Sequence, residues 1–159
     1  GRPRMTGSAA PAGGRFERVQ RIRFAHCDPA GIVFYPQYFV LLQNHVEDWF
    51  GDDLGIAYAR LVSGRRIGLP TVSLQTEFTA ISRFGDEVVL GLAVERLGGS
   101  SLTLALDVRG ADGPRVQVRK VIVCTDLDRH GSQPWPADVR AAIEGFCGKP
   151  PARHPNPAA

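Results

Sequence analysis

The sequence predicts an α+β domain in which one long helix packs against an antiparallel sheet. Between Pro36 and Phe50 apolar residues recur with helical period, whereas between Pro70 and Thr125 successive segments alternate apolar and polar residues. Turn-forming residues such as Gly98-Gly99 separate these alternating segments. Because the helix must bury its apolar stripe, we expect two layers, with the helix on the sheet.

The long helix is predicted to begin at Pro36, whose missing N–H suits the first helical position, and to end at Gly51. Its apolar stripe consists of Tyr38, Leu41, Leu42, His45, Val46 and Trp49. We interpret His45 as a core histidine with a hydrogen-bond partner, because the histidines and acids of the chain do not have metal-ligand spacing.

The remaining elements are expected to be short. The first strand is predicted over residues 16–25, and two short helices are predicted over 54–62 and 134–146. Further strands are predicted over 70–81, 87–96, 102–108 and 115–125. Strict alternation in the first of these places Val72 and Leu74 on one face and Thr71 on the other. The last strand changes phase near Arg119-Lys120-Val121, which predicts a bulge.

Length and composition favour one cytoplasmic domain. A chain of 159 residues with 43% hydrophobic residues can form a single core, predicted over residues 15–148 between disordered ends, 1–14 and 149–159. No apolar run approaches the ~20 residues of a membrane span, and the N-terminus lacks a signal-peptide pattern. The net charge of +3 without a basic stripe is weak evidence for nucleic-acid binding. The three cysteines form neither a CxxC pair nor a disulfide framework, as expected in a reducing compartment.

Residues 26–38 join an acid, a tight turn and a helix N-terminus. Asp28-Pro29-Ala30-Gly31 has turn chemistry, since Asp accepts local amide hydrogens, Pro fixes φ and Gly can adopt positive φ. The helix start offers amides near Tyr35, Gln37 and Tyr38 that can polarise a carbonyl. The neighbouring carboxylate could then attack that carbonyl or activate water, which suits acyl transfer. From spacing alone, simple capping of the turn is the alternative interpretation.

The run Cys27-Asp28-Pro29-Ala30-Gly31-Ile32-Val33-Phe34-Tyr35-Pro36-Gln37-Tyr38 resembles the signature of the 4-hydroxybenzoyl-CoA thioesterases, a family of hotdog-fold acyl-CoA thioesterases. Looser similarity extends over residues 18–126. The resemblance implies a hotdog fold, in which a five- to six-stranded antiparallel sheet wraps a long central helix. It also implies that Asp28 is the catalytic carboxylate, as nucleophile or general base, and that the Tyr35 amide polarises the thioester carbonyl. No metal or other cofactor is expected.

The same resemblance implies where substrate binds and how chains assemble. The expected substrate-binding residues are Gly31, Val33, Phe34, Tyr58, Leu69 and Thr71. Independently of the resemblance, Arg96 and Ser100 beside the Gly98-Gly99 turn are candidate contacts to the CoA phosphates through side chains and amides, with a plain hairpin as the alternative. Family members typically pair their sheets edge to edge and place active sites at the interface, so we expect a homodimer or homotetramer.

Three positions depart from the family pattern. His26 stands where the hydroxybenzoyl enzyme has an acid, Pro36 replaces a histidine of related thioesterases, and the basic run that grips CoA falls on Leu97-Gly98-Gly99. The predicted activity is hydrolysis of an aromatic (hydroxybenzoyl-like) or short acyl-CoA. Three alternatives stay open: a thioesterase for acyl groups on a carrier protein, a dehydratase of the same fold, and a non-catalytic acyl-CoA binding module.

Overall fold

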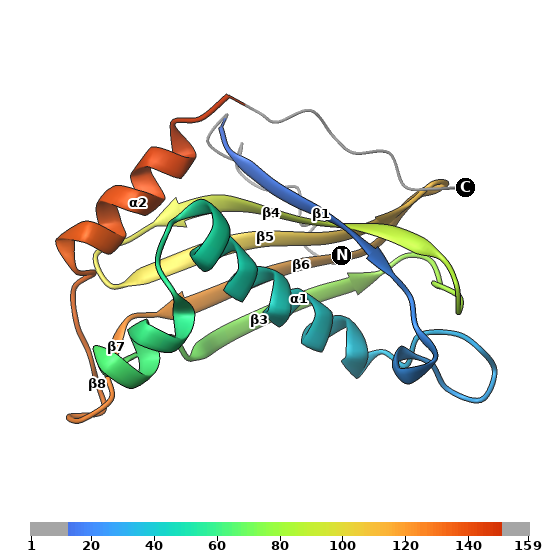
Figure 1. The fold of residues 1–159 in the computed structure, drawn as a ribbon, viewed down its shortest axis with the longest axis horizontal. Helices are drawn as coiled ribbons and strands as arrows, with labels where there is room; N and C mark the ends of the chain where they lie inside the picture. The colour runs from blue at the N-terminus through green and yellow to red at the C-terminus, as the bar shows by residue number, and fades with distance from the viewer. Residues whose placement is uncertain (1–12, 151–159) are drawn as a thin grey trace, which may run out of the picture.

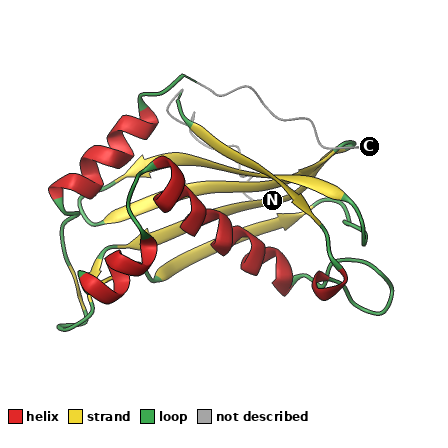
Figure 2. Ribbon diagram, in the orientation of Figure 1, coloured by secondary structure: helices red, strands yellow, loops and turns green. Residues whose placement is uncertain are grey.

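A five-stranded antiparallel sheet and one long helix form two layers in the computed structural model, which describes residues 13–150 (Figure 1). The helix, α1, spans Pro36–Asp48 and crosses one face of the sheet (Figure 2). The strands are β1 (Arg15–Arg21), β3 (Thr71–Phe78), β4 (Glu87–Leu97), β5 (Ser101–Gly110) and β6 (Gly113–Val123). Their order in the sheet is β1-β4-β5-β6-β3, so that β1 and β3 form its two edges. The predicted α+β layout is confirmed.

Short elements surround these two layers. A small sheet pairs β2 (Ile67–Gly68), β7 (Thr125–Asp126) and β8 (Gly131–Ser132). The C-terminal helix α2 spans Ala137–Cys147, and its apolar residues Val139, Ile143 and Phe146 are buried, which confirms the helix predicted there. The helix predicted over 54–62 begins later: residues 58–59 are α-helical and continue into a π-helical turn, Arg60–Gly64.

The first strand is shorter than predicted. β1 ends at Arg21, and the chain then forms a 3-10 turn over Phe24–His26 instead of continuing to residue 25. The amide of Ile22 donates to the Asp86 carbonyl oxygen at 2.8 Å, whereas Phe24 is 71% exposed. The chain leaves the sheet here because the next residues pair with one another instead of with a strand.

The apolar stripe of α1 is buried as predicted. Tyr38, Leu41, Leu42, His45 and Val46 all lie in the core between helix and sheet. His45 is a core histidine: its Nε2 lies 2.9 Å from the Phe16 carbonyl oxygen, and its ring stacks on the Phe16 ring. Since one face of α1 is covered in this way, the helix holds a fixed position on the sheet.

The helix does not end at Gly51. A π-helical turn, Trp49–Asp53, carries the helical path past the predicted stop. Trp49 and Phe50 are fully buried there, and the Trp49 ring packs edge-on against Phe146 of α2. Burial of two large aromatic side chains outweighs the preference of glycine for a helix terminus.

The edge strand β3 contains a bulge that the sequence did not reveal. Thr71 pairs with Ile122 and Ser73 with Val121, which leaves Val72 as an extra residue. The extra residue resets the alternation, so Thr71 and Leu74 lie on the same face of the sheet, towards α1, and not on opposite faces as predicted.

The bulge predicted in β6 near Lys120 was wrong. β5 and β6 keep one register from Ser101 opposite Val123 to Val108 opposite Val116. Lys120 occupies an inward-facing position of this regular strand and is only 9% exposed. The alternation seemed to change phase only because a charged residue, Lys120, occupies a position on the core face.

The predicted ends of the domain lie mostly outside the described residues. Among the residues that are described, Gly14 comes so close to Phe146 that a Cβ atom would lie 2.3 Å from its carbonyl oxygen. At the other end, Lys149 forms an ion pair with Asp53 at 2.8 Å. Within residues 13–150, no helix combines the length and apolar character that crossing a membrane requires.

Candidate active site

A small hairpin before α1 holds the predicted catalytic acid. Cys27 pairs with Val33, and the Asp28 amide donates to the Ile32 carbonyl oxygen at 2.9 Å. The tip of the hairpin is the predicted turn, in which Gly31 has a φ of 77° and its amide donates to the Asp28 carbonyl oxygen. Glycine is suited to this backbone conformation, because other residues adopt it at a cost.

The Asp28 carboxylate has one oxygen engaged in the turn. Its Oδ1 accepts a hydrogen bond from the Ala30 amide at 2.9 Å, so the capping role considered above is present. Within the described part of the chain, Oδ2 accepts no protein hydrogen bond. The Oδ1 hydrogen bond fixes the side chain, and Asp28 is half-buried, so Oδ2 is held in a defined position. Capping and chemistry are therefore compatible in one residue.

At the start of α1 one amide is left without an acceptor among residues 13–150. The Gln37 amide donates to the Phe34 carbonyl oxygen at 2.8 Å, the Tyr38 amide donates to that of Tyr35 at 3.2 Å, and Pro36 has no N–H. The Tyr35 amide has no such protein partner. The helix dipole adds positive potential at this end. Of the three amides proposed from the sequence, Tyr35 alone keeps a free donor.

Arg115 holds the segment 81–86, which contacts this hairpin, and the sequence analysis did not identify this residue. Its guanidinium donates to the Ile81 carbonyl oxygen at 2.7 Å, to the Ser82 hydroxyl at 3.2 Å and to Asp86 at 3.3 Å. The Ser82 carbonyl oxygen in turn accepts from the Val33 amide at 2.9 Å. Arg115 also pairs with Asp112, three residues away, but the partners that support the hairpin lie 29 to 34 residues earlier in the chain, so no local pattern predicts that role.

The two residues before Asp28 have structural roles. The Nδ1 of His26 accepts the Arg23 amide hydrogen at 2.9 Å, so its ring is turned back towards the preceding turn. Burial, together with the Arg23 charge, lowers the pKa of His26. Burial and the nearby carboxylates of Asp28 and Asp86 raise the pKa of the Cys27 thiol. A raised pKa disfavours the thiolate, which argues against Cys27 as a nucleophile.

The aromatic residues next to Asp28 are largely exposed. Phe34 is 52% and Tyr35 58% exposed, and the Tyr35 ring packs edge-on against Phe78 at the end of β3. Of the predicted substrate-binding residues here, Val33 is the exception, since its side chain is buried in the core. Phe34 and Gly31 remain accessible beside the acid.

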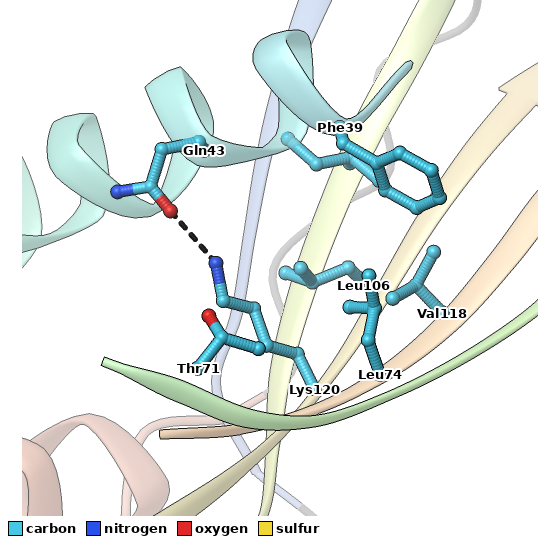
Figure 3. Close-up of a pocket in the computed structure, with 8 residues that line it drawn as sticks. Phe39, Gln43, Thr71, Leu74, Leu106, Val118 and Lys120 are labelled. Carbon is cyan, nitrogen blue, oxygen red and sulfur yellow. Dashed lines mark hydrogen bonds between the residues drawn. The ribbon is translucent and has the colours of Figure 1, made fainter. Parts of the chain in front are cut away.

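A separate cavity of about 250 Å³ lies between the middle of α1 and the β3 side of the sheet (Figure 3). Its lining residues are Phe39, Leu42, Gln43, Thr71, Leu74, Leu106, Val118 and Lys120. The Lys120 ammonium donates to the Gln43 side-chain oxygen at 2.7 Å inside this cavity. Thr71, predicted from the sequence, lines the cavity because of the β3 bulge, whereas Lys120 and Gln43 were not foreseen.

The other predicted binding residues lie at a distance from Asp28. Tyr58 packs edge-on against Phe50, and burial raises its pKa while a hydrogen bond to Gln43 opposes the rise, so Tyr58 neighbours the cavity. Leu69 lines another hollow, beside Thr125. The structure therefore distributes the predicted acyl-binding residues over three places: the hairpin, the cavity with Thr71 and the neighbouring Tyr58, and the hollow with Leu69.

Arg96 and Ser100 share a polar pocket at the far end of the sheet from the hairpin. This pocket, of about 410 Å³, also includes Ser101 and Gln133. Asp86, at the hairpin end, precedes β4, and Arg96 lies near the end of that strand, about 30 Å away at ~3.3 Å per residue. The predicted CoA contacts of Arg96 and Ser100 stay a prediction, and within one chain they lie far from Asp28.

Among residues 13–150 no group of three His, Cys, Asp or Glu side chains is arranged to hold a metal ion. The chemistry available at the hairpin is that of a carboxylate and a backbone amide.

A family model described as the thioesterase-like superfamily matches residues 22–143 of the sequence. The chain belongs to this superfamily. This membership confirms the family that was predicted from the run around Asp28. It also confirms the predicted enzyme class, thioester hydrolase.

Relatives of this thioesterase-like chain share its fold over most of their length. A 1,4-dihydroxy-2-naphthoyl-CoA hydrolase of Synechocystis sp. (strain ATCC 27184 / PCC 6803 / Kazusa) is 21% identical over 132 residues, which cover 82% of this chain and 95% of that protein. The structure of a gentisyl-coenzyme A thioesterase is 25% identical, with a TM-score of 0.72 over 80% of this chain and 99% of the other. A Staphylococcus aureus protein solved in complex with CoA has a TM-score of 0.79 at 16% identity, over 93% and 94% of the two chains.

Proposed function

We propose that the chain hydrolyses the thioester of an aromatic acyl-CoA to the free acid and CoA. The observation that carries this proposal is that Asp28, with one uncommitted oxygen, lies in the hairpin that leads directly to Tyr35, whose uncommitted amide precedes α1. Two relatives are named for aromatic acyl-CoA substrates, and a structural neighbour was solved with CoA, which supports the substrate class.

The chemistry follows from these two groups. The thioester carbonyl oxygen accepts a hydrogen bond from the Tyr35 amide, which draws electrons from the carbonyl carbon and stabilises the oxyanion of the tetrahedral intermediate. Asp28 either attacks the carbon, giving a mixed anhydride that water hydrolyses, or removes a proton from water that attacks directly. In both routes the C–S bond breaks and the CoA thiolate leaves.

The replacement Asp28→Asn tests the proposal. Asparagine keeps the shape of aspartate and an oxygen that can accept the Ala30 amide, so the turn is preserved. The variant loses the charge needed for attack or for proton removal, and kcat for benzoyl-CoA or hydroxybenzoyl-CoA should fall by at least about 10²-fold. Thiol release is the readout, with a thermal melt to verify folding. Near-normal turnover would overturn the proposal, and parallel assays on carrier-linked acyl groups would reveal a carrier-protein enzyme.

Assembly through β3 belongs to the same proposal. β3 is an edge strand, and Val72, Leu74 and Phe78 on it are 61%, 46% and 50% exposed. Exposed apolar residues on an unpaired edge are characteristic of interfaces. Two chains related by a twofold axis would pair their β3 strands antiparallel, which places the partner's Thr71 opposite Phe78.

Such pairing would complete the active site. Phe78 packs against Tyr35, so the hairpin lies at the end of β3 that meets the partner's Thr71. Thr71 lines the cavity with Lys120, and this cavity would therefore approach the Asp28 of the other chain. In the proposed dimer the hairpin supplies the reacting groups, and the partner's cavity receives the acyl group.

A further inference from the structure

The cavity beside α1 contains one cation within mainly apolar walls. Leu42, Leu74, Leu106, Val118 and the Phe39 ring form the walls, and Lys120 enters from β6 towards Gln43 (Figure 3). The volume of about 250 Å³ exceeds the ~150 Å³ of a cavity that admits benzene. The hollow therefore has room for one substituted aromatic ring.

Lys120 is a buried cation without a carboxylate partner among the described residues, whereas the other buried cation there, Arg115, pairs with two aspartates. Lys120 is 9% exposed, and its hydrogen bond goes to the neutral amide oxygen of Gln43. Burial alone lowers the pKa of Lys120, with no acidic side chain to offset it. The only other lysine, Lys149, is half-exposed and pairs with Asp53. A buried ammonium normally requires a paired charge or full hydrogen bonding, because desolvation is costly.

Lys120 occupies a position of β6 where an apolar side chain would avoid the desolvation cost of a buried ammonium. Its neighbours on the same face of β6, Val118 and Ile122, are buried apolar residues, as the core side of a strand requires. An apolar residue at 120 would continue that face. The ammonium instead points into a hollow large enough for a ligand, and an ammonium has three donors, of which Gln43 takes one.

We propose that Lys120, held by Gln43, binds an oxygen substituent on the acyl ring and so makes the enzyme selective for aromatic acyl groups that carry a hydroxyl or carboxylate. This inference rests on the proposed thioesterase function and identifies the part of the chain that selects the substrate. The apolar walls accept the ring, and the remaining donors of Lys120 satisfy the substituent. An unsubstituted ring would leave the ammonium buried with its donors unused, which disfavours it.

The replacement Lys120→Met tests the selectivity. Methionine keeps most of the side-chain stem and removes the charge, so the wall of the cavity is retained. For hydroxybenzoyl-CoA and carboxybenzoyl-CoA, kcat/KM should fall by about 10- to 100-fold, the range of a lost hydrogen bond to a charged group. For benzoyl-CoA it should stay level or rise. Comparing the two substituted esters shows whether a hydroxyl or a carboxylate is preferred.

Lys149→Met is the matched control, because it removes the same charge from the surface and should leave the ratio between esters unchanged. The inference would be overturned if the unaltered enzyme showed no preference for substituted rings. It would also be overturned if Lys120→Met slowed benzoyl-CoA and hydroxybenzoyl-CoA equally, as expected for a lysine that only supports the fold or pairs with an acid of a second subunit. Lys120→Gln provides a second variant if methionine lowers the melting temperature.

A binding experiment separates failure of this inference from failure of the proposed function. Calorimetry with hydroxybenzamide and benzamide, which carry no carboxylate that could itself pair with Lys120, needs no turnover and can use the Asp28→Asn protein. Preferential binding of hydroxybenzamide that Lys120→Met abolishes would support the cavity assignment even if no thioester were hydrolysed. Equal binding of the two amides, or binding of neither, would count against Lys120 as the selecting group whatever the activity.

Discussion

At the residue scale, the contacts of Asp28 and Arg115 explain how the hairpin is held. Asp28 closes its turn through Oδ1 and still presents Oδ2, so the two interpretations of the Asp-Pro turn do not compete. Arg115 carries the segment on which the hairpin rests, through the Ile81 carbonyl oxygen, Ser82 and Asp86. The support from Arg115 does not require exposure, and this side chain is 9% exposed.

Replacing Arg115 with Met should destabilise the protein and loosen the hairpin. The change leaves Asp86 without its cationic partner and the Ser82 region without its buried donor, at a cost of about 3 kcal/mol in the free energy of unfolding. Urea unfolding measures the cost, and kcat is expected to fall because Val33 and its hairpin pack on Ser82. Arg129→Met, whose side chain is 87% exposed, is the control and should be near neutral. A stable, fully active Arg115→Met protein would contradict this role.

At the scale of the element, α1 positions both the hairpin and the cavity. Tyr35 lies at its start and Gln43 lies eight residues later, about 12 Å along the axis at ~1.5 Å per residue. The buried stripe holds the helix on the sheet, so these two points keep a fixed separation. His45 is part of that stripe, and its buried ring predicts that the stability of the protein depends on pH.

Stability should fall as pH decreases below the ordinary pKa of histidine, and His45 should account for part of the loss. Burial is the main cause that lowers the pKa of His45, since a charged ring would bury Nδ1–H without an acceptor among the described residues. Between the folded and unfolded pKa values of His45, the unfolded chain binds more protons, so the free energy of unfolding rises with pH across that window. The contribution of His45 to stability is therefore fully present above about 6.5 and is lost as the pH falls towards the folded pKa.

The variant His45→Gln isolates this contribution, because glutamine can still donate to the Phe16 carbonyl oxygen but does not titrate. Urea unfolding at several pH values between about 4.5 and 7.5 should give a flatter dependence for the variant than for the unaltered protein. Parallel curves would mean that other groups cause the acid sensitivity.

At the scale of the whole molecule, the proposed dimer predicts that each active site uses residues of two chains. The hairpin and the cavity lie at different points along α1 and β3, and a twofold pairing of β3 would bring each hairpin to the other chain's cavity. A mixing experiment tests this. Asp28→Asn damages only the hairpin, whereas Val118→Phe would narrow only the cavity, because Val118 lines it from β6 and not from the edge strand β3.

Each variant alone should be nearly inactive. Random exchange of subunits after mixing should restore about a quarter of the original activity, because half of the dimers are mixed and each contains one site with both halves intact. Sedimentation should give a dimer or a multiple of it. No recovery after verified exchange would place both halves in the same chain and remove the need for the partner.

The sequence alone was sufficient for the elements whose signals are local. The stripe of α1, the turn at Asp28-Gly31, the helix start at Pro36 and the run shared with the thioesterases each depend on neighbours a few residues apart, and all correspond to observed features. Periodicity and turn chemistry act over that range.

Only the tertiary structure decided what depends on distant residues. The path of the chain past Gly51 follows from packing between Trp49 and Phe146, and the inward face of Thr71 follows from pairing with β6. Lys120 looked like a break in a strand, but its contact with Gln43 from α1 makes it part of a cavity. Such features arise because packing and strand register join segments whose separation in the sequence carries no local pattern.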